Sequence, residues 1–204
     1  MVNVRIHPDI YSEYDDSFEI IGEPKYKYYV EAKEIEKVLT DYLCGLNRFP
    51  IYLTVTTYDD YQELENLLNK LGQEYQVKIL ADKVLASTED GGILEYNVPI
   101  IKVKLTTPNA LKKIISNSFW LAETNCAYVI SFSDNVSFKN EIGKDWRNKE
   151  MEYSILLIDM SKDTTTIVLT HDAYGFYLFS NLEECSSVEA FSKKLPKYTI
   201  LSVE

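Results

Sequence analysis

The sequence predicts an α+β fold, in which three to four amphipathic helices pack on a mixed, largely antiparallel sheet. Three observations favour this class. Segments with the two-residue alternation of strands outnumber those with the helical period. Strand, helix and strand follow one another twice in the middle of the chain, and apolar runs separated by short turns fill the last third. We expect one domain over residues 1–204, and the alternative is a division near residue 90 into residues 1–90 and 91–204.

The first fifty residues predict one strand, one loop and one helix. Residues 2–6 alternate weakly and indicate an edge strand, whereas residues 8–24 are acidic and aromatic and indicate a loop. A helical repeat of apolar residues predicts an amphipathic helix over about residues 31–45, ending near Gly45. The apolar residues of this repeat are Ile35, Val38, Leu39, Tyr42 and Leu43.

Two strand–helix–strand segments follow. In the first, residues 51–55 and 75–81 predict the two strands around a helix. In the second, residues 101–105 and 126–132 predict the strands, and Pro108 suits the first turn of the helix between them. The first strand of each segment ends in a Thr-Thr pair, so we interpret the two segments as a weak internal duplication.

The last third of the chain predicts an antiparallel meander. Residues 155–158 are uninterrupted apolar sequence and indicate a strand covered on both faces. Residues 165–170 and 174–179 predict two further strands, separated by a tight turn. A short helix near residues 187–194 precedes a final strand at residues 198–203.

The charge balance disfavours some classes of function and favours others. The chain has 32 Asp and Glu against 21 Lys and Arg, a net charge of −11, without a basic stripe or tail. Binding to nucleic-acid phosphates is therefore disfavoured, because it requires clustered lysine and arginine. Sixteen tyrosines can supply a large contact area at low entropic cost. The Gly-rich phosphate loops, the GxSxG motif and the HExxH motif are missing, so we expect no cofactor.

The cysteines and the termini indicate a cytoplasmic protein. Cys44, Cys126 and Cys185 are widely spaced and form no CxxC pair, which is typical of thiols in a reducing compartment and supports no zinc site. The sequence begins without an apolar signal segment, and it contains no run of about 18 apolar residues. Abundant lysine, isoleucine and asparagine, with little arginine and alanine, indicate an AT-rich genome of a bacterium or phage.

Two segments are candidate partner-binding surfaces. The polar stretch of residues 133–152 connects two predicted strands and carries Trp146 and Arg147, residue types that are enriched at binding hot spots. The alternative for Trp146 is a ring that folds back onto the core. The N-terminal stretch interleaves rings with carboxylates that can meet the Lys and Arg of a target. Its candidate residues are Tyr11, Tyr14, Asp15, Asp16 and Glu19.

One arrangement resembles a catalytic dyad only in its order along the chain. Cys126, His171 and Asp172 follow the order of some cysteine hydrolases. Cys126, however, begins an apolar strand, and a nucleophilic thiol needs surroundings that lower its pKa. His171 and Asp172 fall in a tight turn, where they serve local hydrogen bonds. We therefore assign no catalytic residue and no metal ligand.

These observations favour a non-catalytic acidic protein-binding module of the inhibitor, immunity or anti-defence type, which occupies a basic surface of a target protein. We expect a monomer or weak homo-oligomer with no membrane association. The alternative is a small-ligand or metal-dependent enzyme with a carboxylate-lined pocket between helices and sheet, using Asp15, Asp16 or Asp172. A third hypothesis is a structural subunit of a larger assembly, which forms through an unpaired strand at residues 98–105.

The substitution Trp146→Ala tests the first candidate segment. If Trp146 is a binding hot spot, the change weakens partner binding by more than about 1.4 kcal/mol, a factor of about ten in Kd. The melting temperature should stay nearly unchanged, because no core contact is lost. Calorimetric titration and thermal unfolding measure the two effects, and a large fall in Tm with unchanged affinity would place Trp146 in the core.

Overall fold

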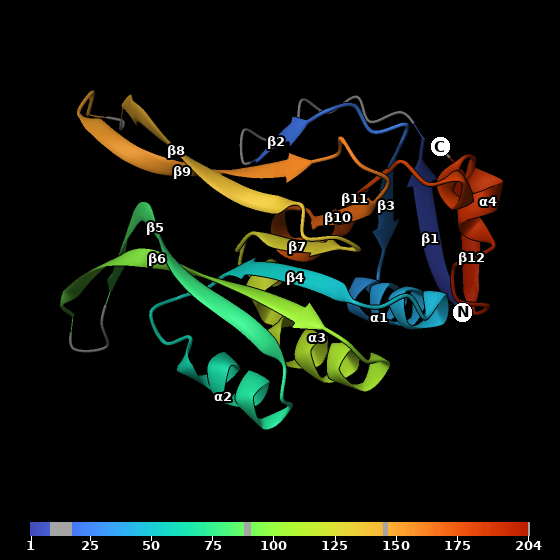
Figure 1. Cartoon of the computed structure of the whole chain (residues 1–204), viewed down its shortest axis with the longest axis horizontal. Coiled ribbons are helices and arrows are strands. Elements are labelled where there is room, and N and C mark those ends of the chain that lie inside the picture. Colours follow the sequence, from blue (N-terminus) through green and yellow to red (C-terminus); the bar gives the residue numbers. More distant parts are fainter. Residues whose placement is uncertain (9–17, 88–90, 145–146, 204) are drawn as a thin grey trace.

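The computed structural model describes residues 1–8, 18–87, 91–144 and 147–203, and this part of the chain contains four α-helices and twelve strands (Figure 1). The predicted α+β class is confirmed. In chain order the elements are β1 (Val2–His7), β2 (Phe18–Ile21), β3 (Tyr26–Ala32), α1 (Ile35–Leu46), β4 (Ile51–Thr56), α2 (Gln62–Lys70), β5 (Glu74–Ser87), β6 (Ile93–Leu105), α3 (Pro108–Glu123), β7 (Tyr128–Ser131), β8 (Val136–Lys144), β9 (Glu150–Asp159), β10 (Thr165–Leu169), η1 (His171–Ala173), β11 (Gly175–Ser180), η2 (Glu183–Cys185), α4 (Val188–Ser192) and β12 (Thr199–Val203).

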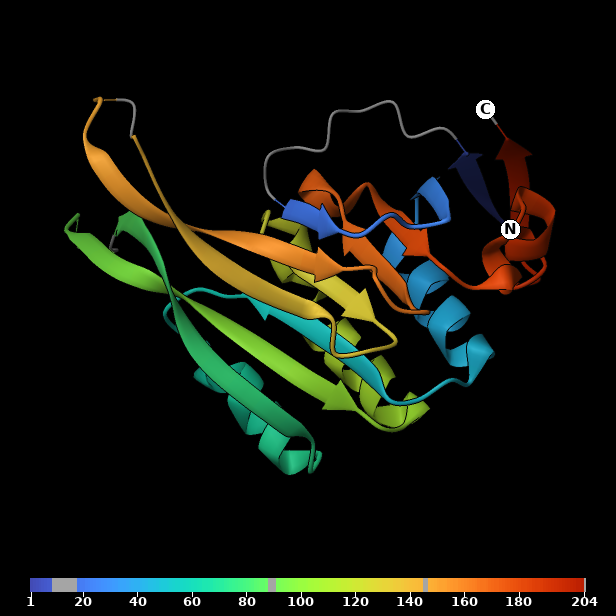
Figure 2. The same cartoon turned by 45° about the horizontal axis from the view of Figure 1, so that its top comes forward.

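The described strands form two sheets in a three-layer arrangement. The larger sheet has nine strands in the order β12-β1-β3-β11-β10-β7-β4-β6-β5, and the smaller has three in the order β2-β9-β8. Figures 1 and 2 show α1, α2 and α3 on one face of the larger sheet and the smaller sheet on the other. The main apolar core lies under the helices. The second core lies between the sheets and contains Phe18, Val129, Val136, Leu156, Ile158, Met160, Val168 and Phe179.

The middle of the chain forms two interleaved β-α-β units. One runs β4–α2–β5 and the other β6–α3–β7, and their strands lie in the order β7-β4-β6-β5 with every neighbouring pair antiparallel. Each unit therefore crosses over the first strand of the other, which is the split β-α-β arrangement. The duplication predicted from the sequence is the repetition of this unit.

The three long helices differ in how deeply they pack. α3 begins as predicted, because Pro108 lies in its first turn and the Thr107 Oγ1 accepts the Ala110 N–H at 3.2 Å. α1 and α3 each bury a full apolar stripe against the sheet. α2 buries only Leu68 completely, and its other apolar side chains, such as Leu64 and Leu67, stay partly open. The shallow packing of α2 leaves space beside α3.

Several sequence-based expectations at the N-terminus were wrong. β1 lies between β12 and β3, so it is not an edge strand; the parallel pairing of Val2 with Thr199 covers its outer side. The segment predicted as loop contains β2, because Phe18 enters the second core. β3 was not predicted at all, and α1 begins after it, at Ile35.

The expectation of a long polar connection at residues 133–152 was also wrong. Most of this stretch forms β8 and β9, which pair in one antiparallel hairpin from Val136↔Ile158 to Lys144↔Glu150. Toward the turn its polar residues lie on both faces of the hairpin, where even Ile142 is 76% exposed. The strand at residues 98–105 is likewise not unpaired, because β6 pairs with β4 on one side and with β5 on the other.

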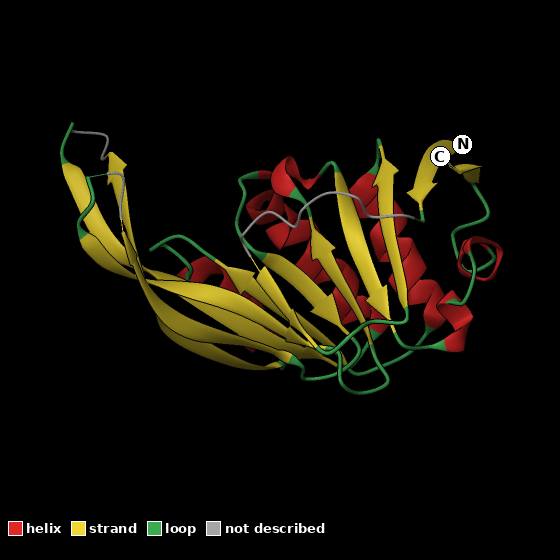
Figure 3. Cartoon of the chain, turned by 90° about the horizontal axis from the view of Figure 1, so that it is seen from above, coloured by secondary structure: helices red, strands yellow, loops and turns green. Residues whose placement is uncertain are grey.

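Two hairpins, β5–β6 and β8–β9, extend side by side beyond the rest of the sheet (Figure 3). They are joined where the β5–β6 register shifts between Ile79 and Lys83. There the Ser154 N–H donates to the Asp82 carboxylate at 3.0 Å, and the Ala81 N–H donates to the Ser154 Oγ at 3.1 Å. The irregularity in β5 therefore provides the contact that connects the hairpins.

A polar network connects the two sheets at the start of β8. The Asn135 side-chain amide donates to the Asp159 carbonyl at 2.9 Å and to the Thr166 Oγ1 at 3.0 Å, and its oxygen accepts from the Ser131 Oγ at 2.6 Å. The Asn181 amide similarly donates to the Met160 carbonyl at 2.6 Å. These bonds satisfy polar groups among the central strands, where an unpaired group costs about 1–3 kcal/mol.

The close approach of β11 to β3 predicts the effect of a glycine substitution. A Cβ atom at Gly175 would lie 2.5 Å from the Val30 carbonyl oxygen and 2.9 Å from the Tyr29 ring. Gly175→Ala should therefore lower the free energy of unfolding by about 2 kcal/mol or more. Gly45→Ala in α1 is the matched control, since its Cβ would meet nothing within 4 Å, and it should raise stability by about 1 kcal/mol.

Urea unfolding of both variants measures these changes. A Gly175→Ala variant as stable as the original chain would contradict the packing of β11 against β3.

Candidate functional site

Most of the residues predicted to bind a partner lie outside the described residues. These are Tyr11, Tyr14, Asp15, Asp16 and Trp146. Glu19 is exposed on β2 and forms an ion pair with Lys139, with 2.8 Å between the Glu19 Oε1 and the Lys139 Nζ. Arg147 is exposed in the turn between β8 and β9. Glu19 pairs with Leu157, seven residues along β9 from Glu150, so about 23 Å separates Glu19 from the start of β9 near Arg147.

Cys126 and His171 line the same small cavity, of about 130 Å³, but their surroundings do not activate the thiol. Burial raises the pKa of the Cys126 thiol, which is the opposite of what a nucleophile requires. Asp172 forms two hydrogen bonds with Asn125. The Asp172 N–H donates to the Asn125 side-chain oxygen at 2.6 Å, and the Asn125 side-chain amide donates to the Asp172 Oδ1 at 3.2 Å. Both residues have left-handed backbone angles, so these bonds stabilise a turn.

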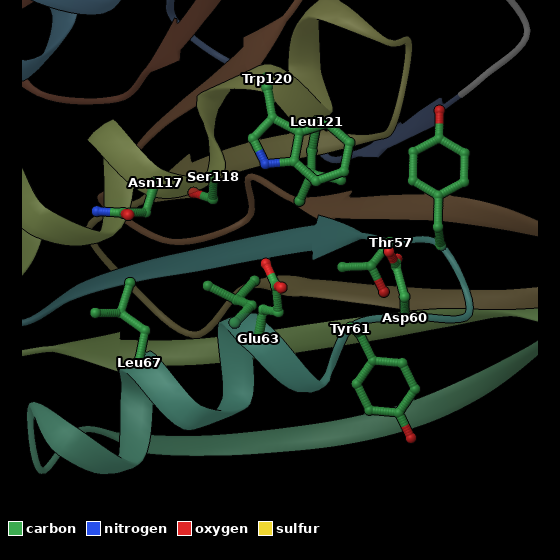
Figure 4. Close-up of a pocket in the computed structure, with 11 residues that line it drawn as sticks. Thr57, Asp60, Tyr61, Glu63, Leu67, Asn117, Ser118, Trp120 and Leu121 are labelled. Carbon is green, nitrogen blue, oxygen red and sulfur yellow. The ribbon is translucent and has the colours of Figure 1, made fainter.

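The cleft between α2 and α3 was not predicted from the sequence (Figure 4). Its volume is about 160 Å³. One wall comes from the connection after β4 and the first turns of α2, and the other from the C-terminal half of α3. The lining residues are Thr57, Tyr58, Asp60, Tyr61, Glu63, Leu64, Leu67, Asn117, Ser118, Trp120 and Leu121.

An aromatic pair forms the mouth of the α2–α3 cleft. The rings of Tyr58 and Trp120 are stacked, with 5.8 Å between their centroids and an angle of 8° between their planes. The Tyr58 hydroxyl donates to the Thr124 carbonyl at 3.4 Å, which fixes the ring against the end of α3. Trp120 nevertheless keeps 47% of its surface exposed. Such a ring offers a large contact area without further ordering.

The charge of the α2–α3 cleft is negative. Asp60 and Glu63 contribute carboxylates, and in the described part of the chain no lysine or arginine lines the cleft. Figure 4 shows the Glu63 carboxylate directed from α2 toward the α3 wall. Burial, and then the Asp59 carboxylate, raise the pKa of the nearby Tyr96 phenol. Carboxylates facing low-dielectric walls concentrate a negative potential that attracts cations.

The position of Trp120 in the sequence predicts that it is exposed on α3, although a search for apolar periodicity does not single it out. At 100° per residue, Trp120 lies about 180° around α3 from Leu111, a fully buried residue of the apolar stripe. Its neighbours Phe119 and Leu121 are buried, so the run Phe-Trp-Leu must expose the tryptophan. A large ring opposite the buried face of a helix is a candidate contact residue.

Two further findings concern the described residues. Over the described residues, no three His, Cys, Asp or Glu side chains are grouped so that they could hold a metal ion. No helix in this part of the chain is long and apolar enough to cross a membrane.

Comparisons with family models, curated proteins and solved structures found no match to this chain. The site is therefore interpreted from its own geometry.

The raised pKa of Cys126 predicts slow alkylation. At pH 8 iodoacetamide should modify Cys126 more slowly in the folded protein than in urea, because burial disfavours the thiolate. The folded-state rate should keep rising with pH through 9, since the thiolate fraction grows until pH passes the raised pKa. Peptide mass spectrometry after timed quenching measures both rates, and faster labelling of the folded protein would indicate an activated thiol.

Proposed function

We propose that the protein is a non-catalytic binding module that attaches to a basic surface of a target protein through the α2–α3 cleft. The observation that carries this proposal is the stacked pair of Tyr58 and Trp120, in which Trp120 is 47% exposed beside the carboxylates of Asp60 and Glu63. Tryptophan and tyrosine are the residue types most enriched at binding hot spots, where they anchor an interface in a small pocket.

The overall charge supports the same kind of partner. A net charge of −11 accelerates association with a cationic surface and disfavours anionic partners such as nucleic acids. An inhibitor or immunity protein acts in this way when it covers a basic surface that its target uses. We place this activity in the cytoplasm of a bacterium or of a phage-infected cell, in agreement with the composition of the chain.

The size of the α2–α3 cleft favours a protein partner over a small-molecule substrate. Pockets for small ligands enclose about 300–1,000 Å³. The cleft has about 160 Å³, enough for one side chain that projects from another protein. Its two lining carboxylates could serve as acid and base, but the space for a substrate between them is small. A binding role therefore accounts for the dimensions better than catalysis does.

Affinity capture with matched variants tests the proposal. The tagged chain should retain a specific basic protein from a lysate of its native cell, and the purified partner is then titrated by calorimetry. Trp120→Ala should weaken binding at least about tenfold, because it removes the ring that anchors the contact. The control is Tyr174→Ala, since Tyr174 is 72% exposed and does not line the cleft.

Tyr174→Ala should keep the original melting temperature, whereas Trp120→Ala should lower the free energy of unfolding by about 1 kcal/mol because the stacking on Tyr58 is lost. Binding of the original chain should weaken as salt increases. Equal binding by Trp120→Ala and the original chain would exclude the α2–α3 cleft as the contact.

A further inference from the structure

We propose that the α2–α3 cleft binds a single arginine side chain of the partner, with the guanidinium stacked on Trp120 and its N–H groups bonded to Asp60 or Glu63. This inference rests on the proposed function and adds the chemical identity of the bound group. It follows from the pairing of the carboxylates, the arrangement of the rings and the dimensions of the cleft.

Among the described residues, the carboxylates of the α2–α3 cleft lack the ion pairs that several other carboxylates on the surface form. The oxygen–nitrogen distance in such pairs is 3.0 Å for Glu74 and Lys104, 2.6 Å for Glu95 and Lys83, and 3.2 Å for Glu184 and Arg48. Within the described ranges, Asp60 and Glu63 have no cationic partner, although both line a concave site. The cleft thus holds negative charge without a counterpart from this part of the chain.

The rings of the α2–α3 cleft favour a flat cation. A quaternary ammonium group is bound by rings that surround it on several sides. Tyr58 and Trp120 are instead stacked and nearly parallel, 8° apart, so they do not surround a cation, and the flat indole of Trp120 keeps 47% of its residue surface exposed. Arginine is suited to such a surface, because its planar guanidinium stacks on aromatic rings while the edge of the group donates hydrogen bonds. The ammonium of lysine is a compact point charge and gains less from a flat ring.

The positions of the acids complete the arrangement. Asp60 precedes α2 and Glu63 lies in its first turn, across the cleft from Trp120 (Figure 4). A guanidinium against the indole would direct its N–H groups toward α2, where a carboxylate can accept two of them. Leu64 and Leu67, which also line the cleft, can contact the aliphatic part of the arginine side chain.

Titration with capped amino acids tests the inference without the partner protein. N-acetyl-arginine amide, N-acetyl-lysine amide and N-acetyl-citrulline amide are added to the ¹⁵N-labelled full chain, and the indole N–H signal of Trp120 is followed by NMR. Citrulline has nearly the shape of arginine without its charge. We expect a saturable shift with arginine, at least about threefold weaker binding with lysine, and no saturable shift with citrulline. The indole of Trp146 should not move.

Charge variants separate a local effect from an effect of net charge. Asp60→Asn combined with Glu63→Gln should weaken arginine binding at least about tenfold. The matched control combines Glu23→Gln with Asp163→Asn, which removes the same groups from exposed positions outside the cleft and should leave the affinity unchanged. Equal losses in both double variants would overturn the inference.

The remaining outcomes distinguish this inference from the proposed function. Equal shifts with arginine and citrulline, or stronger binding of lysine, would overturn the assignment of a guanidinium. If no arginine derivative shifts Trp120 while Trp120→Ala still abolishes partner binding, the inference fails and the proposed function stands. If arginine binds but Trp120→Ala leaves partner binding intact, the proposed function fails and the arginine site stands.

Discussion

Burial of both faces of the central strands is the constraint on which the rest of the structure depends. In β7 and β10, neighbouring residues such as Val129 and Ile130, or Ile167 and Val168, point to opposite faces and are all buried. Such strands need cover on both sides, so helices pack on one face and the β2-β9-β8 sheet on the other. Several polar groups between these layers are paired, as at Asn135, because an unpaired buried group is costly, although the buried Thr54 hydroxyl of β4 has no hydrogen-bond partner among the described residues.

The α2–α3 cleft exists because the helices cover their face of the larger sheet to unequal depths. α3 is long, capped and deeply packed, so it holds Trp120 on a rigid support. Tyr58 lies two residues after the end of β4, a strand in the interior of the sheet. α2 is shorter and buries only Leu68 fully, which leaves the space between it and α3 unfilled. A site held by such elements loses little conformational entropy when a partner binds.

The sequence predicted those parts of the fold that local pattern determines. α1, β4 and α3 follow from apolar periodicity, and the start of α3 follows from Pro108. Residues 133–152, which form β8 and the start of β9, were expected to be a polar connection because this part of the hairpin carries polar residues on both faces. β2 is only four residues long and lies in acidic sequence. The cleft depends on Tyr58 meeting Trp120 across the fold, which no local pattern encodes.

The pairing of β1 with β12 has a consequence for the order in which the chain folds. β1 (Val2–His7) pairs on one side with β3, which follows it closely in the sequence. Its other neighbour, β12 (Thr199–Val203), is translated almost two hundred residues later. The split β-α-β units close through much shorter loops, which costs less chain entropy. That end of the sheet is therefore assembled last, and until then a nascent chain on the ribosome exposes one open side of β1 to chaperones and to other chains.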